Sequence, residues 1–245
     1  MNRNLSPWRV LGALALCSPL FAACNGSEEP DPQGPDSTAR LGDAWSGQAA
    51  AIERDPLEIP ADAPLVIFLG DSISAGLHLD ADQAFPAVLQ SRFVEREIPF
   101  RLVNAGVSGD TTAGGLRRID WLLKQKPQVV LVELGANDGL RGIDVQAIES
   151  NLRQILERIR AAGAEPILVG MHVPTSYGVP YSTAFHGLYG RLAKELAVPF
   201  VPNFLQGVGG MPAFNLADGM HPNVQGHKLL ADNVEAALGK VLVGE

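Results

Sequence analysis

The sequence is poor in cysteine and in positive charge. Its two cysteines, Cys17 and Cys24, are too few for a disulfide scaffold. Only 19 Lys and Arg residues stand against 27 Asp and Glu, and the net charge is −8. A nucleic-acid-binding protein normally carries a basic surplus, so we expect no nucleic-acid partner. The hydrophobic share of 46% among 245 residues is that of a folded globular protein.

Long apolar runs are also scarce, and the one at residues 10–24 is shorter than the about 20 residues that a membrane span needs. It follows Arg3 and Arg9 and ends in small residues, which is typical of a secretory signal peptide. Its last residues, FAAC, resemble a bacterial lipobox, although Phe21 stands where that motif most often has leucine. In a lipobox the cysteine is lipidated and becomes the new N-terminus.

Three segments follow from this interpretation. Residues 1–23 are predicted to be a signal peptide of the lipoprotein type, and Cys24 the lipidation site. Residues 24–63 are predicted to form the lipidated N-terminus and a flexible tether, because residues 25–40 contain no Val, Ile, Leu, Met or aromatic side chain. Residues 64–245 are predicted to form the folded domain. The protein would then be anchored to a membrane of the bacterial cell envelope, facing the periplasm or the outside. The alternative is an ordinary signal peptide and a secreted soluble protein.

From residue 65 onward, short apolar runs alternate with segments of helical periodicity. Strands are predicted at residues 65–69, 100–103, 129–134, 166–171 and 200–201. Helices are predicted at residues 84–97, 112–124, 145–162, 184–196 and 224–242. This alternation predicts an α/β domain in which a parallel sheet is covered on both faces. In such domains, functional residues gather beyond the carboxyl ends of the strands.

Four polar motifs follow predicted strands or precede the last helix. They read GDSISAG at 70–76, NAGVSGDT at 104–111, GAND at 135–138 and DGMHPN at 218–223. Taken singly, each motif could be a turn or a helix cap. Their succession at strand ends indicates instead that they converge on one functional site.

The residue types in these motifs match the requirements of acyl transfer. A serine hydroxyl becomes a nucleophile when a base removes its proton, so Ser72 is the candidate nucleophile and His221 the candidate base. Asp218 can accept a hydrogen bond from the imidazole and hold its tautomer. The backbone N–H groups of Ser72 and Gly109 and the side-chain amide of Asn137 are candidate donors to an oxyanion.

Together the four motifs resemble those of the SGNH (GDSL) hydrolase superfamily, and the resemblance runs from residue 65 to about residue 242. Within the superfamily, the segments GDSISAG, AFPAVLQ, LGANDGLRG and DGMHPN are similar to the bacterial thioesterase I, lysophospholipase and arylesterase branch. The resemblance implies a flavodoxin-like three-layer α/β/α sandwich with a five-stranded parallel sheet. It also implies hydrolysis of carboxylic esters or thioesters without a metal ion or organic cofactor.

We therefore expect a serine esterase or thioesterase, of the arylesterase or lysophospholipase type, that acts on small acyl esters or lysophospholipids. The expected catalytic triad is Ser72, His221 and Asp218, with Ser72, Gly109 and Asn137 forming the oxyanion hole. A carbohydrate O-deacetylase is the related alternative, because the same motifs occur in such enzymes. A non-catalytic binding lipoprotein of the envelope is an alternative of a different class.

Overall fold

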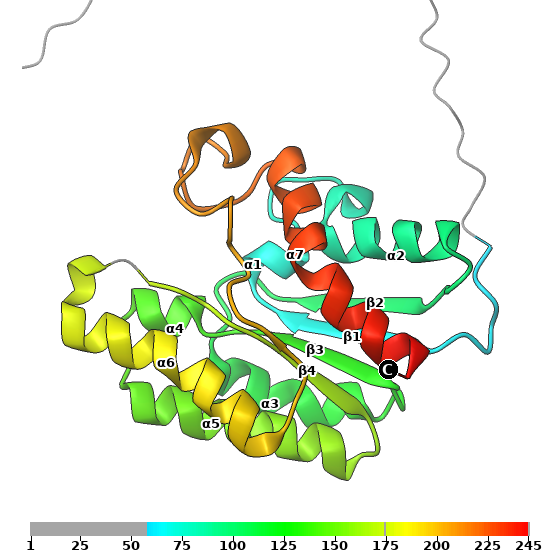
Figure 1. Ribbon diagram of the computed structural model, residues 1–245, viewed down its shortest axis with the longest axis horizontal. Coiled ribbons are helices and arrows are strands. Elements are labelled where there is room, and N and C mark those ends of the chain that lie inside the picture. The colour runs from blue at the N-terminus through cyan, green and yellow to red at the C-terminus, as the bar shows by residue number, and fades with distance from the viewer. Residues whose placement is uncertain (1–57, 174, 245) are drawn as a thin grey trace, which may run out of the picture. The chain divides into compact units, whose positions relative to one another are not determined.

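The computed structural model describes residues 58–173 and 175–244, and five parallel strands form a sheet within them (Figure 1). The strands are β1 (Leu65–Gly70), β2 (Arg101–Gly106), β3 (Val129–Glu133), β4 (Glu165–Val169) and β5 (Phe200–Val201). Their order in the sheet is β2-β1-β3-β4-β5. The predicted α/β class and five-stranded parallel sheet are thus confirmed. The predicted signal peptide, Cys24 and the tether as far as residue 57 lie outside the described residues.

The centre of the sheet is its most apolar part. Every residue of β1 and of β3 is buried, whereas β2, at the edge, is exposed or half-buried along its whole length. Strands covered on both faces read as continuous apolar runs, which is why these two segments were recognisable in the sequence. The strand order reverses between β1 and β3, and ligands of such sheets bind beyond the carboxyl ends at that reversal.

Helices cover both faces of the sheet, as the ribbon shows (Figure 1). The long helices are α2 (Phe85–Glu95), α3 (Thr112–Leu123), α5 (Val145–Ala161), α6 (Val179–Leu196) and α7 (Val224–Val243). Helices α2 and α7 pack together on one face, and α5 packs between α3 and α6 on the other. The result is the expected three-layer α/β/α arrangement. None of the helices in the described part of the chain is both long and apolar enough to cross a bilayer.

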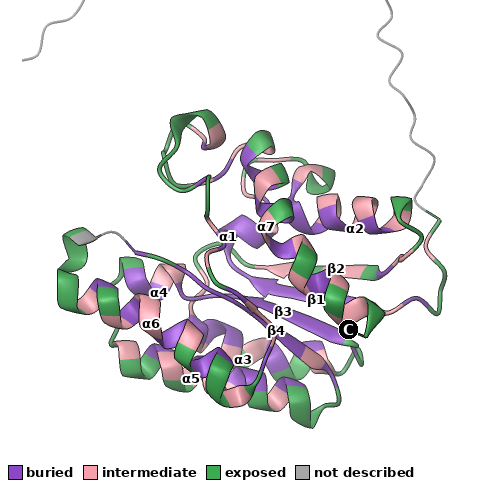
Figure 2. Ribbon diagram, viewed as in Figure 1, coloured by how far each residue is buried: buried purple, intermediate pink, exposed green. Residues whose placement is uncertain are grey.

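Each layer buries one side of its helices and exposes the other, as the colouring by burial shows (Figure 2). In α5, five apolar residues at spacings of three and four face the sheet and are fully buried: Ile148, Leu152, Ile155, Leu156 and Ile159. Each such side chain contributes about 1.5–3 kcal/mol on burial. The packing of α5 on the sheet therefore helps to hold in place the carboxyl ends of the strands, where the motifs lie.

Several element boundaries differ from the predicted ones. Strand β2 continues to Gly106, because residues 104–106 pair with residues 68–70 of β1; the first part of the second motif is therefore strand rather than loop. Helix α6 begins at Val179, five residues before its predicted start. Pro180 lies in its first turn, where the missing N–H breaks no helical hydrogen bond. Strand β4 spans 165–169 rather than 166–171.

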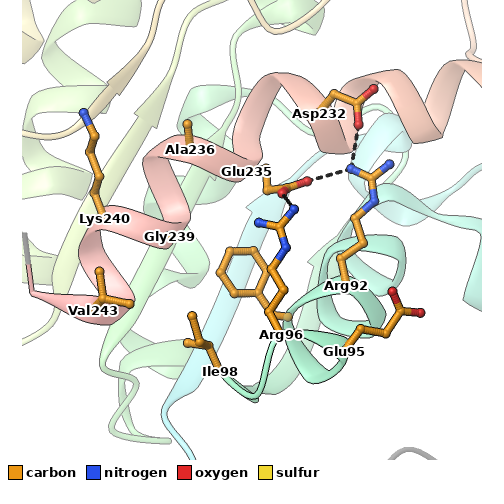
Figure 3. A pocket seen from close by; sticks show the side chains of 11 residues that line it. Arg92, Glu95, Arg96, Ile98, Asp232, Glu235, Ala236, Gly239, Lys240 and Val243 are labelled. Atoms are coloured by element: carbon orange, nitrogen blue, oxygen red, sulfur yellow. Dashed lines mark hydrogen bonds and ion pairs between the residues drawn. The ribbon is translucent and has the colours of Figure 1, made fainter.

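A groove of about 810 Å³ lies between the C-terminal halves of α2 and α7 (Figure 3). Four of its charged side chains form ion pairs with one another. Arg92 contacts Asp232 at 2.6 Å and Glu235 at 2.8 Å, and Arg96 pairs with the same Glu235. These ion pairs connect α2 to α7 across the groove, so the groove is part of the contact between two helices of one layer.

Candidate active site

Ser72 stands at the first turn after the central strand β1. The strand ends at Gly70, and Ser72 begins the one-turn helix α1 (Ser72–Ala75). Asp71 caps this helix, since its Oδ1 accepts a hydrogen bond from the Ile73 N–H at 2.9 Å. A Cβ at Gly70 would collide with Ser74 Oγ and with the Glu133 carboxylate, so the strand must end in glycine here. The hydroxyl of Ser72 is thereby held at the carboxyl end of β1.

His221 and Asp218 belong to one segment between β5 and α7, which internal hydrogen bonds hold in place. Asp218 Oδ1 accepts from the backbone N–H groups of Met220 at 2.9 Å and His221 at 3.0 Å. Asp218 Oδ2 contacts His221 Nδ1 at 2.6 Å. A bridge between Asn215 and Pro222 closes the segment. The three-residue spacing seen in the sequence is thus a turn in which the carboxylate holds both the backbone and the ring of the histidine.

The ring of His221 connects this segment to Ser72. Its Nε2 lies 2.9 Å from Ser72 Oγ, across 149 positions of sequence. Because Nδ1 faces a carboxylate, which only accepts hydrogen bonds, Nδ1 carries the proton and Nε2 is left to accept from the serine hydroxyl. The hydrogen bonds that Asp218 accepts hold the pKa of its carboxyl group well below the usual range, with that from the His221 backbone N–H contributing most. Asp218 is therefore ionised and supports this tautomer.

Asn137 reaches the same place from β3. It lies in the short helix α4 (Ala136–Leu140), which is separated from the end of β3 by two residues. The residue before the helix is Gly135, whose φ is +119°. The Nδ2 of Asn137 donates to Asp71 Oδ2 at 3.0 Å. The third motif is thus joined directly to the residue before Ser72, as the reversal of strand order between β1 and β3 predicts.

Gly109 lies in the loop between β2 and α3 with a φ of +78°, a conformation that favours glycine. Its carbonyl oxygen accepts from Arg141 Nη2 at 3.0 Å. Arg141 directly follows α4, so one guanidinium holds the Gly109 peptide beside the helix that carries Asn137. With this carbonyl bound by Arg141, the peptide that joins Gly109 to Asp110 has a fixed orientation. The structure thus links all five predicted site residues by short contacts, two of them through Asp71 and Arg141.

Two further residues of this region were not singled out from the sequence. Arg118 of α3 donates to the carbonyls of Gly70 at 3.0 Å and Ala105 at 2.6 Å, and it pairs with Asp110 at 2.8 Å. It therefore ties the ends of β1 and β2 to the loop that holds Gly109. Nothing in the sequence distinguishes it from an exposed helical arginine.

Glu133, the last residue of β3, is fully buried directly beneath the first motif. Burial and the nearby charge of Asp71 raise its pKa well above the usual range. The sequence feature that could have drawn attention to Glu133 is its position as an ionisable residue in the otherwise apolar run VVLVEL. Within residues 58–173 and 175–244, no group of three or more His, Cys, Asp or Glu side chains is arranged to hold a metal ion.

The site brings a serine hydroxyl into contact with an imidazole ring, and comparison with known proteins identifies the family of the chain. The family model described as the GDSL-like Lipase/Acylhydrolase family matches residues 68–229, which include all four motifs. The chain belongs to this family. The resemblance to SGNH (GDSL) hydrolases noted from the motifs is thus confirmed.

Family members of known name are similar over most of their length. Esterase TesA from Pseudomonas aeruginosa is 43% identical over 183 residues, which cover 74% of this chain and 91% of the esterase. Thioesterase 1/protease 1/lysophospholipase L1 from Escherichia coli strain K12 is 45% identical over 173 residues, covering 70% of this chain and 82% of that protein. The expected similarity to the thioesterase and lysophospholipase branch is confirmed.

The GDSL fold is also found in solved structures. The crystal structure of a protein named TesA superimposes with a TM-score of 0.70 at 42% sequence identity, covering 72% of this chain and 99% of that one.

Proposed function

We propose that this chain hydrolyses carboxylic esters or thioesters through an acyl-enzyme formed on Ser72. The observation that carries the proposal is the continuous chain of hydrogen bonds from Ser72 Oγ through His221 to Asp218, with distances of 2.9 and 2.6 Å. A base within such reach of a serine hydroxyl, itself oriented by a third group, is the arrangement that activates a nucleophile.

Each step assigns one task to one group. His221 Nε2 takes the hydroxyl proton as Ser72 Oγ attacks the acyl carbon, and the Asp218 carboxylate stabilises the imidazolium that forms. Donors from the Ser72 and Gly109 N–H groups and from the Asn137 amide stabilise the oxyanion. The imidazolium then protonates the leaving alcohol or thiol, and the acyl group remains on Ser72. Water, deprotonated by His221, attacks the acyl-enzyme and releases the acid.

Apolar side chains beside α4 support an acyl substrate with a hydrocarbon chain. Leu140 and Ile143 are 46% and 39% exposed, and Tyr177 and Val179 are 39% and 67% exposed. These side chains lie on adjoining segments, because the Tyr177 hydroxyl donates to the Leu140 carbonyl at 3.1 Å. Helix α4 also carries Asn137, so this apolar surface adjoins the reacting groups. It fits the acyl chains of arylesterase or lysophospholipase substrates better than a sugar acetate.

A series of p-nitrophenyl esters from acetate to octanoate tests the proposal. We expect hydrolysis of every ester, with kcat/KM at least about tenfold higher for octanoate than for acetate, since each buried methylene contributes up to about 0.8 kcal/mol. Val179→Ser should reduce this preference while changing acetate hydrolysis little.

The alternatives give other results in the same series. An O-deacetylase would cleave acetate and lose activity as the acyl chain lengthens. A binding lipoprotein would cleave none of the esters, and this outcome would contradict the proposal.

We further propose that Cys24 is lipidated and anchors the mature protein to a membrane of the cell envelope. The support is the motif FAAC after a short apolar run, followed by the polar segment 25–40. One acyl chain binds a membrane only weakly and two bind stably, so a stable anchor on Cys24 requires a lipid with at least two acyl chains. A lysophospholipid or small ester is the substrate class that such a location would supply.

Cys24→Ser should move the protein from the membrane fraction to the soluble fraction, or leave it uncleaved, when cells expressing it are fractionated. Mass spectrometry of the mature wild-type protein should find an N-terminal lipid-modified cysteine. Cys17→Ser, which alters a residue inside the predicted signal peptide, serves as the matched control and should leave the fractionation unchanged. An unmodified Cys24 in the mature protein would favour simple secretion.

A further inference from the structure

Two carboxyl groups lie buried beneath Ser72, and the steps above use neither. Asp71 is 1% exposed and Glu133 is fully buried. They meet where β1 and β3 pair, in the register that sets Gly70 opposite Glu133. The Asp71 N–H donates to Glu133 Oε2 at 3.2 Å, and the Ser74 hydroxyl donates to the same oxygen at 2.6 Å. The other oxygen of Glu133, Oε1, is buried without a hydrogen-bond partner.

Both oxygens of Asp71 are occupied by donors that matter for the site. Oδ1 accepts from the Ile73 N–H at 2.9 Å, which caps the helix that begins with Ser72. Oδ2 accepts from Asn137 Nδ2 at 3.0 Å. An amide nitrogen carries two hydrogens, so one N–H of Asn137 is bound to Asp71 and the other remains available.

We propose that Asp71 is a positioning residue that acts through Asn137, its carboxylate selecting the amide orientation in which the free N–H of Asn137 faces the oxyanion. This inference rests on the proposed function, in which Asn137 is an oxyanion donor. The amide oxygen and nitrogen of asparagine have nearly the same shape, and hydrogen bonding alone decides between the two orientations. A carboxylate only accepts, so it binds the NH₂ side and excludes the oxygen.

The single negative charge of the carboxyl pair resides on Asp71. Asp71 accepts two N–H donors through its two oxygens, whereas Glu133 has one oxygen without any partner, and an ionised carboxylate requires such partners when buried. Burial, opposed by those hydrogen bonds, raises the pKa of Asp71 to about 6. Asp71 therefore loses its charge, and its preference for the NH₂ side, as the pH falls below about 6.

Other titratable groups face this pair from the surrounding elements. His221 approaches from the segment before α7, and Asp110 with its partner Arg118 from the β2–α3 side. Tyr189 of α6 donates to the Leu134 carbonyl at 3.0 Å, and burial raises the pKa of its phenol well above the usual range, so it stays neutral. Acid inactivation should thus include the protonation of Asp71.

The test is a double-mutant cycle between Asp71→Asn and Asn137→Ala. In Asp71→Asn, the new side chain can place its NH₂ group opposite Asn137, where the wild type has a carboxylate oxygen. The amide of Asn137 then flips, and its oxygen faces the oxyanion in place of its N–H. We expect Asn137→Ala to lower kcat by about 10²–10³, and Asp71→Asn to lower it by about 30–100-fold with KM nearly unchanged. In the Asn137→Ala background, Asp71→Asn should cost less than about threefold.

The pH profile supplies a readout that a purely structural role would not alter. Below pH 6, log kcat/KM of the wild type should fall more steeply than that of Asn137→Ala, in which the protonation of Asp71 has no amide to act through. Glu133→Gln should leave the midpoint of this acid limb unchanged, because it removes no charge. Asp120→Asn, an exposed Asp on α3 paired with Arg158, is the matched control and should change neither kcat nor slope.

Thermal unfolding shows whether each variant is folded. If Asp71→Asn does not fold, Asp71→Ser replaces it, because serine still caps α1 and is too short to hold Asn137. An equal loss of kcat on replacing Asp71 in both backgrounds would overturn the inference, as would a folded Asp71→Asn with wild-type kcat. If Asn137→Ala itself retained wild-type kcat, the proposed oxyanion role would fail first, so the two failures are distinguishable.

Discussion

Ser72→Ala should lower kcat for p-nitrophenyl butyrate by about five to six orders of magnitude. The hydroxyl is the atom that forms the acyl-enzyme, and the remaining groups retain only the residual catalysis of an oxyanion hole without its nucleophile. The fold should be preserved, because Ser72 Oγ contacts only the His221 ring among the groups described above. Burst kinetics with the wild type and their absence in the variant would measure the loss directly.

Ser74→Ala is the comparison for this result, since Ser74 lies only two residues away in the same short helix. Its hydroxyl donates to Glu133 rather than to a base, so it cannot become a nucleophile there. We expect Ser74→Ala to retain activity within about tenfold. A folded Ser72→Ala protein with near wild-type kcat would refute the assignment of the nucleophile.

His221→Ala should lower kcat by about 10⁵ or more, and Asp218→Asn by about 10⁴. The first change removes the base. The second leaves the base but replaces the carboxylate that fixes the Nδ1–H tautomer, while the asparagine Oδ1 can still accept from the His221 backbone N–H. Because hydrogen bonds keep the pKa of Asp218 below its usual range, Asp218 remains ionised above pH 4 and adds no acid limb of its own.

The comparison is made on kcat/KM across pH, with circular dichroism to establish that each variant is folded. The residual activity of His221→Ala should depend on pH differently from that of the wild type, since the base is absent. If His221→Ala lost no more than about tenfold while Asp218→Asn abolished turnover, Asp218 would have to be considered as the base.

The sheet and the convergence of the five candidate site residues were predictable from the sequence because both depend on local patterns. Strands β1 and β3 are buried on both faces and therefore read as unbroken apolar runs. The motifs of Ser72 and Asn137 directly follow these strands, so the topology of a parallel sheet predicts that they meet. Helix α5 was recognisable from its apolar spacing over 17 residues.

Other features depend on contacts that no local pattern records. Helices α1 and α4 contain four and five residues, too few to show helical periodicity, yet they carry Ser72 and Asn137. Strand β2 extends into the polar residues 104–106 because the neighbouring β1 supplies hydrogen bonds to its backbone. Arg118 acts on the carbonyls of Gly70 and Ala105, and these lie far from it in sequence.

The position of the two halves of the site along the chain has a consequence for biosynthesis. Ser72 follows the first strand, whereas His221 precedes the last helix, α7, which packs on α2 and on the two-residue strand β5. Domains fold as units during synthesis, and β5 is too short to be stable before α7 docks. We therefore expect Ser72 to stay inactive until the C-terminal helix has left the ribosome. A nascent or C-terminally truncated chain should have no esterase activity, so that hydrolysis of a chromogenic ester would report that the whole domain has folded.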